Sequence, residues 1–120
     1  MRQSRFDLLH GLRRRRLDAC RTQLAAVRRL GDELGDRLSE TVRAAGSVVA
    51  EQRSAIGPGE LVIERMADCR RRRVELQQVE RMLSRRRDLG DEVTDLARLN
   101  LEEAVRQVEV IERLVEKVSE

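Results

Sequence analysis

The sequence predicts an all-α fold, a long antiparallel two-helix coiled-coil hairpin that forms one domain over residues 1–120. Three observations predict it: apolar residues recur at alternating three- and four-residue intervals, one Gly-Pro-Gly interrupts the chain near its middle, and the two ends carry opposite charge. A thick globular core is hard to build from this composition, because charged residues make up 39% of the chain and Phe6 is the only aromatic residue. Each large aromatic side chain would bury about 150–250 Å² in such a core.

The first predicted helix covers about residues 5–56. Ser4 followed by Asp7 resembles a capping box at its start. Nine of the twelve positions in its predicted seam are apolar, which matches a heptad pattern and not the alternation of a strand. The seam comprises Leu17, Cys20, Leu24, Val27, Gly31, Leu34, Leu38, Thr41, Ala45, Val48, Gln52 and Ala55.

A turn at residues 57–59 and a second helix over about residues 60–118 complete the hairpin. Pro58 suits the first turn of a helix, where its missing N–H is not needed. Between residues 62 and 83 the seam is weaker, since Arg73 or Glu80 interrupts it. The next apolar residues step by four, which predicts a stutter in the coiled coil, and they are Leu89, Val93, Ala97 and Leu101. The last seam positions are Leu101, Ala104, Val108, Ile111, Val115 and Val118.

The short turn predicts neighbouring helices that run antiparallel, with residues side by side where their numbers sum to about 117. The charge of the two chain ends agrees with a chain that folds back on itself. Residues 1–16 carry six arginines and one aspartate, whereas residues 88–120 carry ten acidic and four basic residues. We expect Arg13 to Arg16 beside Glu102 and Glu103. Exposed ion pairs contribute only about 0–1 kcal/mol each, so they select the register more than they stabilise it.

Candidate chemical groups point away from catalysis. Cys20 and Cys69 fall on the seam, where cysteine behaves as a small buried hydrophobe, and the predicted register separates them too far for a disulfide. His10 has no partner at metal-ligand or triad spacing. Carboxylates alternate with arginines on helix faces, and a two-helix pair offers no concave pocket to perturb them. We therefore expect no enzyme activity, cofactor or metal site.

The N-terminal residues have no apolar h-region of a signal peptide, and no run approaches the roughly 20 apolar residues of a membrane span. We expect a cytoplasmic protein without membrane insertion. The glycines inside the predicted helices have two readings: close approach or bending of the helices, or positions at which glycine is merely tolerated. They are Gly11, Gly31, Gly35, Gly46 and Gly90.

Clusters of arginine at residues 13–16, 70–73 and 85–87 could neutralise nucleic-acid phosphates. Consecutive arginines, however, cover every face of a helix and form no basic stripe. Acidic neighbours are close, and the aromatic side chains on which bases stack are absent. Nucleic-acid binding is therefore the weaker alternative, and we expect no nucleic-acid partner.

Apolar residues off the seam are more informative. A two-helix pair cannot bury them all, and an unburied apolar stripe indicates a partner protein or self-association, whereas scattered exposure would need no explanation. These residues are Leu12, Leu30, Val42, Val49, Val105, Val110 and Leu114.

Two terminal motifs resemble the flagellar FliJ family of type III export components. The opening Arg5-Phe6-Asp7-Leu8-Leu9, followed by Leu12 and an arginine-rich stretch, is similar to the RF-x-L-x-x-L-L start of that family. The ending, with Glu102-Glu103-Ala104 and then Glu109 to Lys117, resembles its closing A…K-x-L-E-K-L-x-E-K pattern. The resemblance covers nearly the whole chain.

The resemblance implies a coiled-coil stalk, peripheral to the membrane export apparatus, that binds the export ATPase ring and the cytosolic domain of the export gate. Export chaperones are further candidate partners. The residues implied at the ATPase end are Phe6, Leu9, Arg13, Arg16, Leu114 and Lys117. The hairpin half offers Val42, Val49, Met66 and Arg70 for the gate. A stalk of a virulence-type secretion system and a generic coiled-coil scaffold remain alternatives.

Overall fold

The computed structural model describes residues 2–54 and 60–119, and all of them lie in two helices, α1 (Arg2–Ser54) and α2 (Glu60–Ser119). The two helices pack against each other, so the predicted antiparallel two-helix coiled-coil hairpin is confirmed. The predicted turn at residues 57–59 lies outside the described residues. Because α1 begins at Arg2, Ser4 lies within its first turn. The predicted helix cap at Ser4 is therefore wrong, since an N-cap residue precedes the helical turns.

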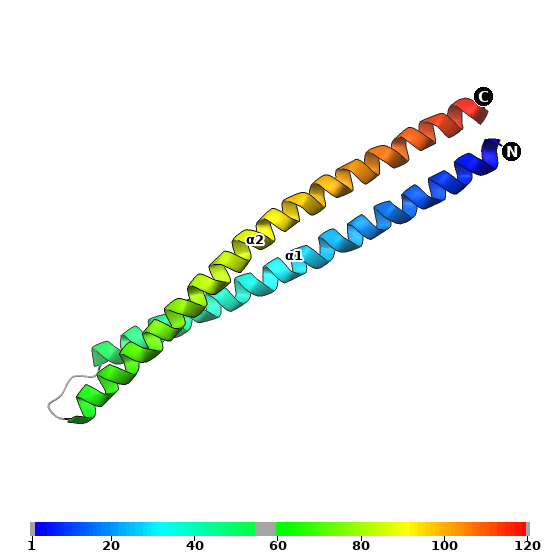
Figure 1. The fold of residues 1–120 in the computed structure, drawn as a ribbon. Coiled ribbons are helices and arrows are strands. Elements are labelled where there is room, and N and C mark those ends of the chain that lie inside the picture. Colours follow the sequence, from blue (N-terminus) through cyan, green and yellow to red (C-terminus); the bar gives the residue numbers. More distant parts are fainter. Residues whose placement is uncertain (1, 55–59, 120) are drawn as a thin grey trace. The chain divides into compact units, whose positions relative to one another are not determined.

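Each helix contributes to two compact units. Unit 1 consists of Met1–Leu30 and Gly90–Glu120, and unit 2 consists of Gly31–Leu89. Within unit 1 the two helical segments run side by side in opposite directions, and the N- and C-terminal ends of the chain lie at the same end of the unit (Figure 1). Unit 2 likewise pairs the second half of α1 with the first half of α2, through contacts of Glu51 with Cys69 and Arg72.

The seam predicted for α1 is confirmed at every described position. Leu17, Cys20, Leu24 and Val48 are buried, and the other seven positions from Val27 to Gln52 are half-buried. The seam also extends further towards the N-terminus than predicted. Phe6, His10 and Arg13 continue the same intervals and are half-buried, so α1 presents one unbroken heptad stripe to α2.

The seam of α2 differs from the prediction between residues 89 and 94. Leu89 is 61% exposed and Val93 is 47% exposed, whereas Gly90 and Thr94 are half-buried. The seam of α2 therefore keeps the heptad spacing through this region, at Leu83, Arg87, Gly90, Thr94, Ala97 and Leu101, and among these residues only Arg87 is exposed. The predicted stutter is wrong. Thr94 is accommodated because its Oγ1 donates to the carbonyl oxygen of Gly90 at 2.8 Å.

The helix register differs from the predicted sum of about 117. In unit 1, Arg13 and Arg16 contact Gln107, so the contacting numbers sum to 120 and 123. In unit 2, Glu51 contacts Cys69 and Arg72, which again sum to 120 and 123. Packing explains this register. A sum of 121 sets every seam position of one helix against a seam position of the other, whereas a sum of 117 does so at only every second position.

A buried hydrophobic cluster in unit 1 follows this rule. Leu17 and Cys20 pack with Ala104 and Val108, and half-buried apolar residues of α2 complete the cluster. Leu17 with Ala104 sums to 121, as does Cys20 with Leu101. Both cysteines are buried and free, as expected for seam residues. Within the described ranges, no helix is long and apolar enough to cross a membrane.

The interior glycines do not mark close approach. A Cβ added at Gly11, Gly31, Gly35, Gly46 or Gly90 would meet no heavy atom of a neighbouring element within 4 Å. Close approach is therefore excluded as the reason for glycine at these positions, and an alanine would fit at each.

We expect Leu24→Asp to unfold the helix pair, because it places an unpaired carboxylate at a side chain that is only 5% exposed. The loss in free energy of unfolding should be at least about 3 kcal/mol. The measurement is thermal unfolding followed by far-UV circular dichroism. Gln23→Asp, one residue earlier at an exposed position, is the control and should shift the midpoint little. Equal midpoints for the two variants would contradict the seam.

Gly46→Ala should stabilise the protein. The position is exposed and open, so the methyl group meets no obstacle, and alanine is favoured over glycine inside a helix by about 1 kcal/mol. Chemical denaturation should show a higher midpoint with an unchanged slope. A lower midpoint would show that glycine at this position serves a packing role.

Candidate protein-binding surfaces

Unit 1 contains the six residues implied at the ATPase end, and the register divides them into two groups. Phe6 and Arg13 occupy half-buried seam positions. The Nη1 of Arg13 donates to the main-chain oxygen of Gln107 at 3.0 Å, so this arginine joins the helices. The other four side chains are exposed and available to a partner, and they are Leu9, Arg16, Leu114 and Lys117.

A polar chain crosses unit 1 in place of the expected ion pairs with Glu102 and Glu103. Arg16 Nη1 donates to Gln107 Oε1 at 2.6 Å, and Gln107 Nε2 donates to Glu103 Oε1 at 3.4 Å. Arg16 therefore reaches Glu103 through an amide. The observed register explains why Gln107 takes this place, because it pairs residues whose numbers sum to about 121 and so sets Gln107 beside Arg13 and Arg16. Nearer the termini, His10 Nε2 lies 3.3 Å from Glu112 Oε1.

One face of unit 1 is nearly free of charge between residues 9 and 30 of α1 and between residues 93 and 114 of α2, and by the same spacing Arg5 and Lys117 continue its two stripes towards the chain termini. A stripe along α1 lies next to a stripe along α2, because Arg16 of the first contacts Gln107 of the second. We call the two stripes together the neutral face. Its side chains are exposed except for half-buried Gln107. The face comprises Leu9, Leu12, Arg16, Ala19, Gln23, Ala26 and Leu30 of α1, with Val93, Leu96, Asn100, Glu103, Gln107, Val110 and Leu114 of α2.

The other side of the seam in unit 1 is highly charged. Twelve of its fifteen positions are acidic or basic, against two of fourteen on the neutral face. We call it the charged face, and it comprises Asp7, Gly11, Arg14, Asp18, Arg21, Ala25 and Arg28 of α1, with Asp91, Asp95, Arg98, Glu102, Val105, Glu109, Glu112 and Glu116 of α2. Unit 1 thus presents two chemically distinct sides to its surroundings.

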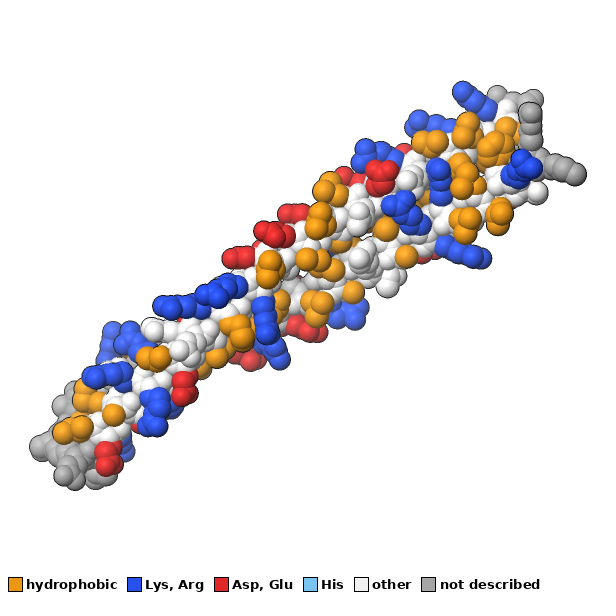
Figure 2. All heavy atoms as spheres, viewed as in Figure 1, with side chains coloured by type: hydrophobic (Ala, Val, Ile, Leu, Met, Phe, Trp, Pro, Cys, Tyr) orange, Lys and Arg blue, Asp and Glu red, His pale blue; other side chains and the backbone are white. Residues whose placement is uncertain are grey.

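Hydrophobic side chains gather over both helices in the part of unit 1 near the chain termini (Figure 2). Of the seven off-seam apolar residues singled out from the sequence, five are 41–59% exposed: Leu12, Leu30, Val42, Val110 and Leu114. Val49 and Val105 are half-buried, and Val105 packs against the core cluster. Four of the five exposed residues belong to the neutral face, which makes this face the main candidate surface.

Unit 2 contains the four residues implied for the gate. Val42 is 50% exposed, and Val49, two turns further along the same side of α1, is half-buried. Met66 is a half-buried seam residue of α2, whereas the side chain of Arg70 is exposed. The exposed surface offered by these four residues is therefore smaller than the neutral face of unit 1.

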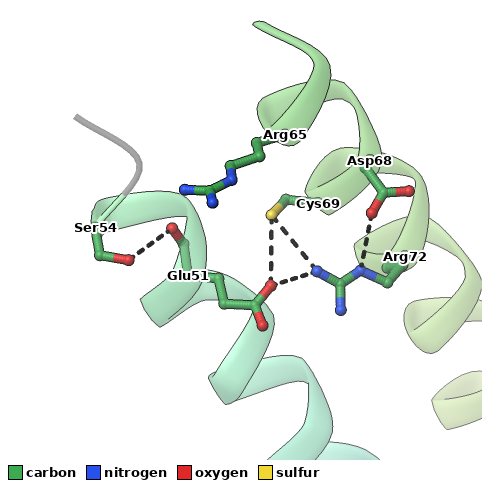
Figure 3. A pocket seen from close by; sticks show the side chains of 6 residues that line it. All are labelled: Glu51, Ser54, Arg65, Asp68, Cys69 and Arg72. Carbon is green, nitrogen blue, oxygen red and sulfur yellow. Dashed lines mark hydrogen bonds and ion pairs between the residues drawn. The ribbon is translucent and has the colours of Figure 1, made fainter. Parts of the chain in front are cut away.

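Sequence reasoning missed a polar contact between the helices of unit 2. Arg72 of α2 forms an ion pair with Glu51 of α1, and its Nε lies 3.6 Å from Asp68 Oδ2 (Figure 3). Cys69 lies beside them, with Sγ 3.9 Å from Glu51 Oε2 and 3.8 Å from Arg72 Nη2. The hydrogen bond that Arg72 donates to Glu51, and after it the one that Arg72 donates to Cys69, raises the pKa of Arg72 above its ordinary value. This guanidinium is therefore a fixed positive charge.

A cavity of about 420 Å³ adjoins this contact and is lined by Glu51, Ser54, Arg65, Asp68, Cys69 and Arg72 (Figure 3). Its charged lining includes Arg72, which pairs with Glu51 and Asp68. Across the described residues, no group of three or more histidine, cysteine, aspartate or glutamate side chains is placed to hold a metal ion.

Comparison of the chain with protein-family models, with curated proteins and with solved structures finds no match. The functional assignment therefore depends on the residues and surfaces described above.

Arg72→Ala should lower the thermal midpoint modestly, because it removes the ion pair that joins α2 to Glu51 of α1. The difference from wild type should shrink in about 1 M NaCl, where the screening length falls to about 3 Å. Arg71→Ala is a matched control, since Arg71 pairs only with Asp68 of its own helix among the ion pairs described. Identical midpoints for both variants at low salt would contradict a joining role for Arg72.

Proposed function

We propose that this chain is a non-catalytic coiled-coil stalk of a flagellar type III export apparatus, which binds the export ATPase with unit 1 and the export gate with unit 2. One observation supports a binding role above others. The helix pair fills its own seam, yet sixteen large hydrophobic side chains of the described residues stay exposed. Surplus apolar surface of this kind is typical of proteins that bind other proteins.

The assignment to an export apparatus is supported by the terminal motifs. Arg5-Phe6-Asp7-Leu8-Leu9 opens α1, and the Glu- and Val-rich ending closes α2. Both motifs belong to unit 1. The neutral face begins in the same motifs, at Leu9 and Leu114, so the residues that carry the resemblance adjoin the surface that best suits a protein partner.

Non-catalytic action is supported by the chemistry of the surfaces. The acidic residues of unit 1 lie mainly on the charged face, where they are exposed to water. The polar contact around Arg72 has its charges paired. Catalytic carboxylates, in contrast, need burial or a like-charged neighbour to shift their pKa into a useful range.

Retention of a purified type III export ATPase on the immobilised full-length chain tests the proposal. We expect retention at low salt, and we expect Leu9→Glu combined with Leu114→Glu to weaken it by about thirtyfold or more, as for central interface residues. Val42→Glu, in unit 2, is the matched control and should leave ATPase retention unchanged while weakening binding to the cytosolic domain of the gate. Wild-type chain that is folded but retains no ATPase would overturn the proposal.

A further inference from the structure

We infer that the neutral face of unit 1 binds a second copy of this chain, forming a dimer in which unit 1 of each copy contributes two helices to a four-helix bundle. This goes beyond the proposed function, because it concerns the chain alone. Three features of the face support a second copy as its occupant: the arrangement of its apolar residues, the sign and position of its charges, and its area.

The apolar residues occur at matching levels of both helices. Arg16 and Gln107 are in contact, and their residue numbers sum to 123. Leu9 and Leu114 have the same sum, so they lie at the same level, that is, at the same height along the two helix axes. Leu30 lies level with Val93 by the same sum. Both stripes therefore have apolar residues at their two ends, and polar Arg16 and Gln23 of α1 lie level with polar Gln107 and Asn100 of α2. The two patterns differ at Ala19, which lies level with Glu103.

This likeness makes the face complementary to itself. When a two-fold axis runs parallel to the helices, α1 of one copy packs on α2 of the other at the same level. Leu9 then meets Leu114 of the second copy, Gln23 meets Asn100, and Leu30 meets Val93. Every helix in the bundle has antiparallel neighbours, as in up-down-up-down bundles.

The charges fit the same arrangement. Arg16 and Glu103 are the only charged residues of the neutral face, they have opposite signs, and they lie about one helical turn apart in level. In the dimer each Arg16 therefore lies near Glu103 of the other copy. The charged face offers no comparable contact, because its twelve charged side chains would lose water on association. Depletion of charge is also what distinguishes the centre of protein interfaces.

The area is sufficient for a dimer. The seven leucines and valines of the face are each 36–61% exposed. With the two alanines and five polar residues, the face presents on the order of 1,000 Å² per copy, against the roughly 800 Å² per partner of a standard interface. No segment within the described parts of unit 1 covers this surface, since its side chains are exposed.

The chain offers a matched pair of variants for the test. Ala26 belongs to the neutral face and Ala25 to the charged face, and both are exposed neighbours in α1. Ala26→Arg and Ala25→Arg have the same mass, charge and composition, and arginine is a good helix former, so both should fold. Far-UV circular dichroism verifies this for each variant.

Sedimentation equilibrium of the full-length chain measures the dimer. We expect dimeric wild-type protein, a dissociation constant raised at least about tenfold by Ala26→Arg, and a change within about twofold for Ala25→Arg. Leu96→Arg, on the α2 side of the face, should act like Ala26→Arg. Arg16→Glu should also weaken the dimer, and combining it with Glu103→Arg should restore it.

Two results would overturn the inference. One is a wild-type chain that stays monomeric at concentrations of about 100 µM, since an interface of this area should hold a dimer there. The other is a dimer that Ala26→Arg and Ala25→Arg affect equally, since such a dimer uses another surface. Leu9 and Leu114 belong both to the neutral face and to the residues implied at the ATPase end, whereas Ala26 and Leu96 belong to the neutral face alone. The Ala26 and Leu96 variants therefore test the dimer separately, and a failed retention experiment leaves the sedimentation measurement unaffected.

Discussion

The two helices can bury their apolar stripes only where seam residues of α1 meet seam residues of α2, and this matching determines the rest of the structure. Residue numbers that sum to 121 satisfy this condition, as Leu17 with Ala104 shows in unit 1. In unit 2 the contacts of Glu51 with Cys69 and Arg72 have sums of 120 and 123, which lie on either side of 121. A shift of four residues would set every second seam position against a residue outside the seam and expose part of the apolar surface that drives the pairing. Side chains beside the seam have little influence on the register, so their chemistry is available for other uses.

The register also determines which residues beside the seam of α1 adjoin which residues beside the seam of α2, and so forms the neutral face and the charged face. Leu9 and Leu114 are far apart in sequence, and nothing in either helix alone relates them. Once Arg16 meets Gln107, the apolar residues beside the seam adjoin one another on one side of unit 1, and the charges collect on the other. Charge segregation of this kind favours association through one face and keeps the opposite face hydrated.

Sequence alone predicts the helices and most of the seam, because the heptad spacing in α1 is nearly uninterrupted. It fails at Leu89 and Val93, which are more apolar than Gly90 and Thr94 but lie off the stripe. Hydrophobicity alone places Leu89 and Val93 in the seam. In the structure, the regular heptad spacing of α2 as a whole places Gly90 and Thr94 there instead. The ion pair of Arg72 with Glu51 could not be predicted either, since a register centred on the turn does not bring those residues together. Finding the neutral face likewise requires the correct register first.

The composition of the seam connects stability with association. Its buried residues include Cys20, Cys69, Ala97 and Ala104, and small side chains remove less apolar surface from water than leucine does. Glycines inside the helices, which no close contact requires, weaken the pair further. A helix pair held by so modest a core gains stability from any partner that binds only its folded form. Leucines placed beside the seam, and not in it, therefore stabilise the fold when a second chain covers them, so that folding and association are coupled through the same surface.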